Sequence, residues 1–306
     1  MEMVNMQLQI FVLLVVGWLF GRKSGLGEQG RTAVNELAMN LVLPCAIAHS
    51  FQMKLTQEIL QSTVAVLVMS IVIQTVMYFV SRWMWRGIHS EAKRINLSYA
   101  TLVNNAGTLG MVIAQAAFGQ EGMLYSAIYM IPVRILMWSY GVSAFSGLKK
   151  EGNRWKVLLH PCLIGIYCGL ALMVLESMSG ALPEFLQMSL NTLAACNTPL
   201  CMILIGLILS EAHSGLKPIK LDGIYVVLRL LILPLIMLGV VWFLPVPSLA
   251  KAICVLETAM PAPVTMAMLA QKYRRDPLFA SRMVMYSTLG SMVTLPVWSW
   301  LLNVFF

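Results

Sequence analysis

Long apolar runs constrain this sequence more than any other feature. Ten stretches of about 20 predominantly apolar residues follow one another along the 306-residue chain, and a helix of that length crosses the hydrocarbon core of a bilayer. Charged residues make up only 11% of the chain, against about 25% in soluble domains. We therefore predict an all-α polytopic membrane protein with ten transmembrane helices, at 4–21, 32–53, 59–81, 95–118, 122–146, 157–176, 183–210, 223–245, 248–271 and 278–305.

Composition excludes several other classes of protein. The net charge of +8 comes from basic residues spread over short loops, so we expect no nucleic-acid partner. The six cysteines lie within apolar runs and form no C-x-x-C pair, which favours packing residues over a metal site or disulfides. No loop carries a G-x-x-x-x-G-K phosphate-binding motif, and we expect no cofactor. The first apolar run follows a start without Lys or Arg, which favours a membrane helix over a signal peptide.

Basic residues predict the orientation in the membrane. Of the 21 Lys and Arg residues, 17 lie in loops that follow odd-numbered helices and 2 in loops that follow even-numbered ones. Cytoplasmic loops carry the excess of Lys and Arg in membrane proteins. We therefore expect a multi-pass protein of the cell (plasma or inner) membrane, with both termini on the non-cytoplasmic side.

The chain divides into two halves, residues 1–150 and 151–306, with five predicted helices each. Because five is odd, the second half enters the bilayer in the opposite sense, as an inverted repeat does. The second and seventh helices carry matching prolines, Pro44 and Pro199, which we interpret as support for helix breaks. We predict one membrane unit built from two inverted five-helix repeats.

Helix-breaking residues interrupt the fourth and the ninth predicted helices at corresponding places. Gly107 and Gly110 each weaken a helix by about 1 kcal/mol relative to Ala, while Pro261 and Pro263 lack the backbone N–H and clash with the preceding turn. Broken backbone is tolerated at membrane depth only where protein buries it or a wet cavity surrounds it. Paired interruptions of this kind point to a transporter's binding site, and a simple kink between packed helices is the alternative.

Four short segments resemble the auxin efflux carrier family, which belongs to the wider group of bile-acid and arsenite transporters. These segments are Asn40-Leu41-Val42-Leu43-Pro44, Asn105-Ala106-Gly107-Thr108-Leu109-Gly110 followed by Phe118-Gly119, Ala259-Met260-Pro261-Ala262 with Leu269-Ala270 and Tyr273, and Tyr286-Ser287-Thr288-Leu289 followed by Leu295-Pro296. The resemblance covers nearly the whole chain. It implies two inverted five-helix repeats, with helices four and nine crossing as broken helices at the substrate site, and small organic anions as cargo.

This sequence departs from the family pattern at two positions. Val112 stands where the fourth-helix signature usually has a proline, so the first break must unwind through Gly107 and Gly110 or unwind less. Arg134 stands where the fifth helix usually carries a polar amide, which points to a different substrate charge.

Charged residues inside the apolar runs are the leading candidates for function. Arg134 lies about 18 Å into its run and Glu257 lies four residues before Pro261, and such charges are kept mostly where they face a protein interior or a cavity. Arg134 is either a fixed positive charge for an anionic substrate or half of an ion pair. Glu257 is either a proton or cation site or the partner of Arg134. Arg229 lies seven residues past Asp222, and we expect it to snorkel to the cytoplasmic surface.

Three asparagines are candidates for neutral recognition of a substrate. The amides of Asn104 and Asn105 can bind a carboxylate or carbonyl beside freed backbone, and Asn197 stands directly before Thr198-Pro199. Asparagine also forms hydrogen bonds between membrane helices, which is the alternative role for each of them.

These features together favour a secondary transporter that moves a small organic anion by alternating access. The expected partners are that anion, the lipid bilayer and a coupling proton or sodium ion, and a homodimer is left open. A channel or a sensor of the same fold is the alternative. An intramembrane enzyme would need paired carboxylates or a His/Asp cluster on facing helices, which this sequence does not offer.

Overall fold

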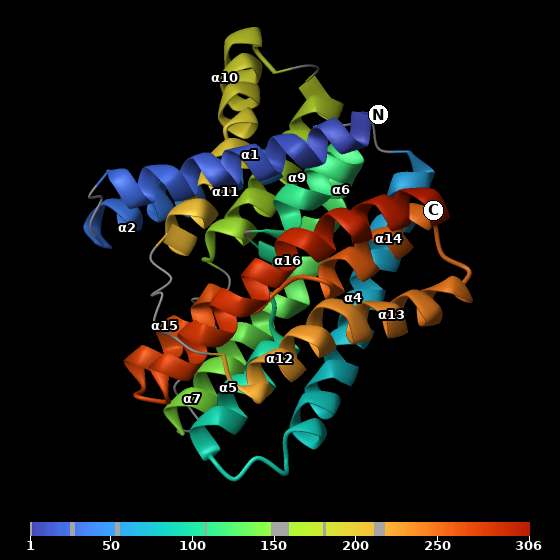
Figure 1. The fold of residues 1–306 in the computed structure, drawn as a ribbon. Coiled ribbons are helices and arrows are strands. Elements are labelled where there is room, and N and C mark those ends of the chain that lie inside the picture. Colours follow the sequence, from blue (N-terminus) through green and yellow to red (C-terminus); the bar gives the residue numbers. More distant parts are fainter. Residues whose placement is uncertain are drawn as a thin grey trace. The chain divides into compact units, whose positions relative to one another are not determined.

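The computed structural model describes residues 2–24, 28–52, 56–107, 109–147, 159–179, 182–210 and 218–306 (Figure 1). Within these ranges the chain forms helices joined by turns and short connections, and it contains no β-strand. Several loop cations used for the predicted orientation lie outside the described residues, namely Lys54, Lys149, Lys150, Arg154, Lys156 and Lys217.

Long apolar helices confirm the prediction of an all-α membrane protein. Five helical stretches among the described residues are long and apolar enough to cross a bilayer: Gln57–Met84, Gly110–Ser146, Glu184–Leu207, Lys220–Trp242 and Pro277–Phe305. A sixth helix, Pro161–Leu175, is apolar but shorter. The count of ten spans and their arrangement as inverted repeats stay predictions.

The chain folds into two compact units, and each draws on both halves of the sequence. The first contains residues 1–60, 111–127 and 158–214. Its helices are α1 (Glu2–Lys23), α2 (Glu28–Leu37), η1 (Ala38–Val42), α3 (Leu43–Ser50), part of α6 (Gly110–Leu136), α9 (Pro161–Ser179), α10 (Glu184–Ala195) and α11 (Asn197–Ser210). Within this unit α1 packs on α11 and α3 packs on α9. Gly17 lies directly against the backbone of Ile203, as small residues allow where membrane helices approach closely.

The second unit contains residues 61–110, 128–157 and 215–306. Its helices are most of α4 (Gln57–Met84), α5 (Glu91–Leu102), η2 (Asn105–Gly107), the end of α6, η3 (Met137–Gly141), α7 (Val142–Ser146), α12 (Lys220–Val227), η4 (Leu228–Ile232), α13 (Leu233–Trp242), α14 (Ser248–Thr258), α15 (Val264–Lys272) and α16 (Pro277–Phe305). Within this unit α13 packs on α14, and α15 packs on α16.

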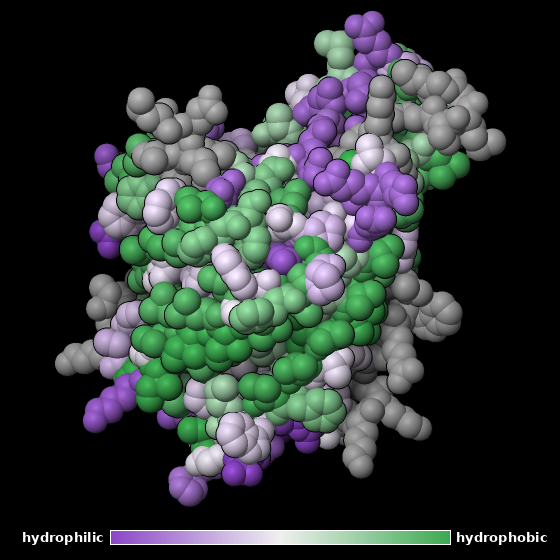
Figure 2. All heavy atoms as spheres, turned by 90° about the vertical axis from the view of Figure 1, so that its right-hand side faces the viewer, coloured by the Kyte–Doolittle hydropathy of each residue, from purple (hydrophilic) through white to green (hydrophobic). Residues whose placement is uncertain are grey.

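Large apolar side chains remain exposed on the outer faces of α4 and α13. Phe79 on α4 is 65% exposed and Ile236 on α13 is 58% exposed. Figure 2, which looks onto the side of Figure 1 where α13 lies, shows a broad field of hydrophobic side chains. Such a field is unfavourable in water and is what a lipid-facing surface requires.

A glycine turn divides α6 into two helical arms. Gly119 has φ 66° and ψ −149°, a conformation that a residue with a Cβ adopts only under strain. The turn falls between the predicted helices 95–118 and 122–146, where the sequence requires the chain to reverse.

Candidate functional site

Two helix breaks lie in the second unit, and the described residues of each are buried. The first separates α5, which ends at Leu102, from α6, which begins at Gly110, with the short turn η2 between them. The break starts before the two glycines, because Val103 is already extended at φ −105° and ψ 138°. The second separates α14 from α15, where residues 260–263 are not helical. Pro263 has φ −78° and ψ 140° there, and α15 starts directly after it.

The two breaks bind each other through hydrogen bonds. The backbone N–H of Asn105 donates to the carbonyl of Pro261 at 2.9 Å. The side-chain amide of Asn104 donates to the backbone carbonyl of Glu257, and its oxygen accepts from the N–H of Ala106 at 3.3 Å. Asn104 therefore connects the two breaks by hydrogen bonds. This is the interhelical role that the sequence analysis gave as the alternative to substrate binding. No hydrogen bond joins the Asn105 side-chain amide to another of the described residues, so that amide is the better placed of the two for a ligand.

Arg229 supplies a connection that the sequence analysis missed. It is 2% exposed, so the expectation that it snorkels to the surface was wrong. Its Nε donates to the carbonyl of Met260 at 2.9 Å, and its Nη1 donates to the carbonyl of Thr101 at 3.0 Å. One guanidinium thus satisfies carbonyls at the ends of both α14 and α5. Carbonyls at a helix end have no N–H donor within the helix, so when they are buried another donor must bind them.

Helix spacing explains why Arg229 reaches this position. Tyr225 lies four residues before it on the same face, and the Tyr225 hydroxyl donates to the carbonyl of Ala100 at 2.9 Å. Arg229 lies in η4, a π-helical turn next to Pro234, and such turns often occur at functional sites. The signal in the sequence was a tyrosine and an arginine at i and i+4 within an apolar run.

Arg134 and Glu257 lie against the two glycines of the first break. Arg134 is 7% exposed, and a Cβ placed on Gly107 would overlap its guanidinium. Glu257 is fully buried, and a Cβ placed on Gly110 would overlap its carboxylate. The glycines therefore let two buried charges approach the backbone. A carboxylate beside the first residue of α6 also suits the positive end of that helix.

The junction of the two breaks carries an excess of positive charge. The charged residues buried there are Arg134, Arg229 and Glu257, two cations and one anion. Ser287 of α16 holds the second break through its hydroxyl, which accepts from the N–H of Ala262 at 3.1 Å. Among the described residues, no three His, Cys, Asp or Glu side chains gather in a way that would hold a metal ion.

Three of the residues singled out from the sequence belong to the first unit. Asn197 is buried and donates from its amide to the Gln115 side chain at 3.3 Å. Pro44 lies in the first turn of α3, directly after the π-helical turn η1. Pro199 lies in the first turn of α11, just after the interruption at Cys196.

Comparison with known proteins identifies the family. A family model described as "Membrane transport protein" matches residues 3–154 and 151–299. An "Uncharacterized transporter" of Methanothermobacter thermautotrophicus is 28% identical over 302 residues, covering 95% of this chain and 96% of that protein. The transporters MJ1031 of Methanocaldococcus jannaschii and YfdV of Escherichia coli are 21% and 23% identical and match over at least 95% of both chains. The resemblance read from the sequence motifs is confirmed, and the chain belongs to the membrane transport protein family of auxin efflux carriers.

Proposed function

We propose that this membrane transport protein is a secondary transporter of a small organic anion, such as a carboxylate, and that the anion binds at the junction of the two helix breaks. The groups proposed to meet it are Arg134, the Asn105 amide and backbone freed at Gly107, Gly110 and residues 261–263. Alternating access would open this junction to one side of the membrane at a time.

Charge supports an anionic substrate. The junction holds two buried guanidinium groups against one carboxylate, so a single negative charge would neutralise it. An uncompensated charge at membrane depth costs about 2.5–3.5 kcal/mol on insertion scales. Arg134 is the guanidinium proposed to bind the substrate, because it lies against the backbone of Gly107 in the first break.

The composition of the two units supports ten spans in two inverted repeats. Under such a repeat the first and second helices correspond to the sixth and seventh, and all four fall in the first unit. The contact of α1 with α11 joins the first and seventh helices, and that of α3 with α9 joins the second and sixth. The repeat operation exchanges these two contacts, as a two-fold axis requires.

The orientation remains the one that the positive-inside rule favours, with both termini on the non-cytoplasmic side of the cell membrane. Glu257 is proposed either to hold Arg134 when the site is empty or to carry a coupling proton. A sodium ion is the alternative coupling ion.

The observation that carries the proposal is the burial of Arg134 and Glu257 against the glycines of a helix break. Its test compares Arg134→Gln, Glu257→Gln and the double variant in proteoliposomes, with a panel of radiolabelled mono- and dicarboxylates. We expect Arg134→Gln to abolish saturable uptake while the protein stays folded, and the double variant to stay inactive. Arg282→Gln is the matched control. It breaks the ion pair between Arg282 and Asp222 (2.6 Å), which belongs to the same unit but lies outside the junction.

A purely structural pair would behave differently. Arg134→Gln would then strand Glu257 and destabilise the protein by about 3–5 kcal/mol, and the double variant would recover both stability and transport. Full transport by the double variant would therefore remove Arg134 from the substrate site. Counterflow of labelled substrate separates a carrier from a channel, because only a carrier exchanges bound substrate across the membrane.

A further inference from the structure

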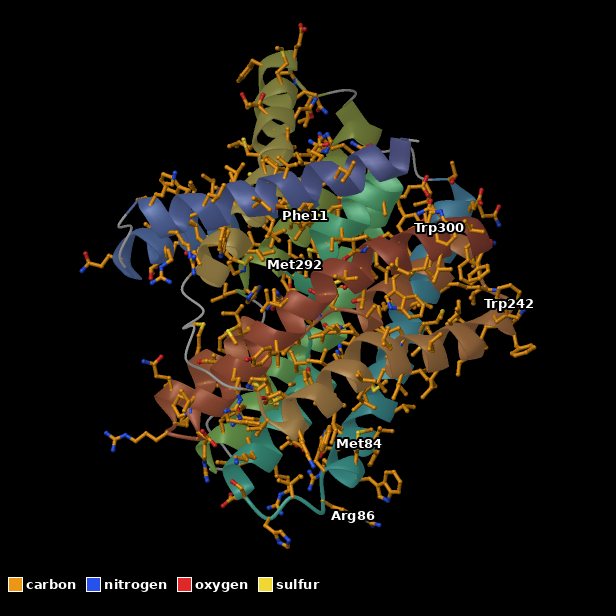
Figure 3. The ribbon with its side chains drawn as sticks, viewed as in Figure 1. Phe11, Met84, Arg86, Trp242, Met292 and Trp300 are labelled. Atoms are coloured by element: carbon orange, nitrogen blue, oxygen red, sulfur yellow. The ribbon has the colours of Figure 1, made fainter. Side chains whose placement is uncertain are left out.

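A basic cavity lies in the second unit, outside the junction of the two breaks. It has a volume of about 410 Å³, and the end of α4, the start of α5 and the turn η3 form its walls. Its polar lining consists of Arg82, Arg86, Glu91, Arg94, Ser98 and Tyr140. Figure 3 shows Met84 at the end of α4 and Arg86 in the turn that follows it.

Positive charge dominates the cavity. Three guanidinium groups face one carboxylate, and that carboxylate, Glu91, already forms an ion pair with Arg275 at 3.4 Å. The guanidinium fork matches the oxygen atoms of a phosphate, and Arg is therefore over-represented at phosphate sites. The cavity thus offers a cationic lining without an internal counter-charge sufficient to neutralise it.

Aromatic side chains orient two of these arginines. Arg82 donates from Nη1 to the Tyr78 hydroxyl at 3.0 Å and lies 5.5 Å from the centre of the Tyr78 ring. Arg86 lies 5.5 Å from the centre of the Trp83 ring. A guanidinium held over a ring loses less side-chain freedom when a ligand binds.

The surface of α4 that leads to the cavity is apolar and exposed. Four valines on α4 follow one another at i+4 spacing, and each is at least 51% exposed: Val64, Val68, Val72 and Val76. Trp83, near the end of the same helix, is 65% exposed. Residues four apart share one face of a helix, so they form a continuous apolar stripe that ends at the arginines. A stripe of this kind suits an acyl chain, and a tryptophan next to basic residues is typical of the membrane–water interface.

We propose that this cavity binds the phosphate headgroup of an anionic membrane lipid, with an acyl chain along the stripe on α4. Basic pockets between membrane helices on the cytoplasmic side take anionic headgroups in this way. The phosphate would sit among the side chains of Arg82, Arg86 and Arg94, with the Ser98 and Tyr140 hydroxyls as further donors. A soluble phosphate ester shares the headgroup chemistry, so the test must separate the two sources.

The test measures binding of dioctanoyl phosphatidylglycerol to the purified full-length protein by native mass spectrometry. We expect the variant Arg82→Gln/Arg86→Gln/Arg94→Gln to bind at least about a hundredfold more weakly, because each charge-assisted contact contributes about tenfold or more. The control variant Lys220→Gln/Lys272→Gln/Arg274→Gln removes three exposed charges of the same unit that do not line the cavity, and its affinity should change by less than about threefold. If the glutamine variant does not fold, the corresponding triple lysine variant keeps the charge, loses the fork geometry and should bind about tenfold more weakly.

Three results would overturn the proposal. Equal losses in the cavity and control variants would mean that net charge alone attracts the lipid. Dioctanoyl phosphatidylcholine binding as tightly as the anionic lipid would mean that the cavity does not select a negative headgroup. Glycerol phosphate binding as tightly as the lipid would identify a soluble phosphate ester as the ligand.

Discussion

Arg229→Met tests whether one guanidinium holds both helix breaks. The change removes hydrogen bonds to Met260 and Thr101, which are charge-assisted and together contribute about 3–6 kcal/mol. It also relieves the burial of a charge, which costs about 2.5–3.5 kcal/mol on insertion scales. The midpoints of the two ranges differ by about 1.5 kcal/mol, so we expect a net destabilisation of about 1–2 kcal/mol, concentrated at the ends of α5 and α14.

Hydrogen–deuterium exchange measures this effect segment by segment. A loss of about 1–2 kcal/mol should raise the exchange rate of the Val103 and Ala259 amides by roughly 5- to 30-fold, because these amides close the last turns of α5 and α14. Amides in the middle of α4 are the internal control and should be unchanged. Tyr225→Phe removes only one neutral hydrogen bond, which is worth about 0.6 kcal/mol in a membrane, so its effect should be confined to α5 and reach only about threefold.

The joint response of the two segments is the decisive result. If Arg229 bridges both breaks, a single substitution accelerates exchange at both. Faster exchange in α5 with unchanged exchange in α14, or no change in either, would refute the bridging role. The measurement needs no knowledge of the substrate and therefore stands apart from the proposed function.

Two further predictions concern the second break and the orientation. Replacing Pro261 and Pro263 together with Ala should favour a continuous helix, with normal membrane expression and strongly reduced transport in proteoliposomes; transport at the wild-type rate would reduce the break to a kink. In a cysteine-free background, a cysteine at His89 should react with an impermeant thiol reagent only after permeabilisation, while one at Ser248 should react in intact cells. Both positions are exposed, and the reverse pattern of labelling would invert the predicted orientation.

The sequence was sufficient for the class of protein and for the two helices that break within the second unit. These features are local: apolar runs of membrane length, with Gly107 and Gly110 in one run and Pro261 and Pro263 in another. The free energy of exposing broken backbone to hydrocarbon does not depend on the rest of the fold. The same reasoning singled out Arg134 and Glu257, because a charge in an apolar run is conspicuous wherever the run packs. The family motifs could be recognised for a similar reason, since they include these helix-breaking glycines and prolines.

The roles of individual polar residues depended on contacts between distant segments. Asn104 was a candidate ligand in the sequence, yet its amide binds the carbonyl of Glu257, 153 positions away. Asp222 was taken as a marker of the membrane edge, but it is 1% exposed and paired with Arg282, so depth measured from it was misleading. Position along a helix gives the depth of a side chain but not the neighbour that its face meets.

Arg229 shows most clearly what only the tertiary structure decided. The sequence determined that an arginine occupies an apolar run, and its position near the predicted end of that run favoured snorkelling. Its two acceptors lie 31 and 128 positions away, on different broken helices, and only the packed fold brings their unsatisfied carbonyls to one guanidinium. Because hydrocarbon offers these carbonyls no other donor, the fold selects the buried position, and this choice depends on the breaks and the arginine together.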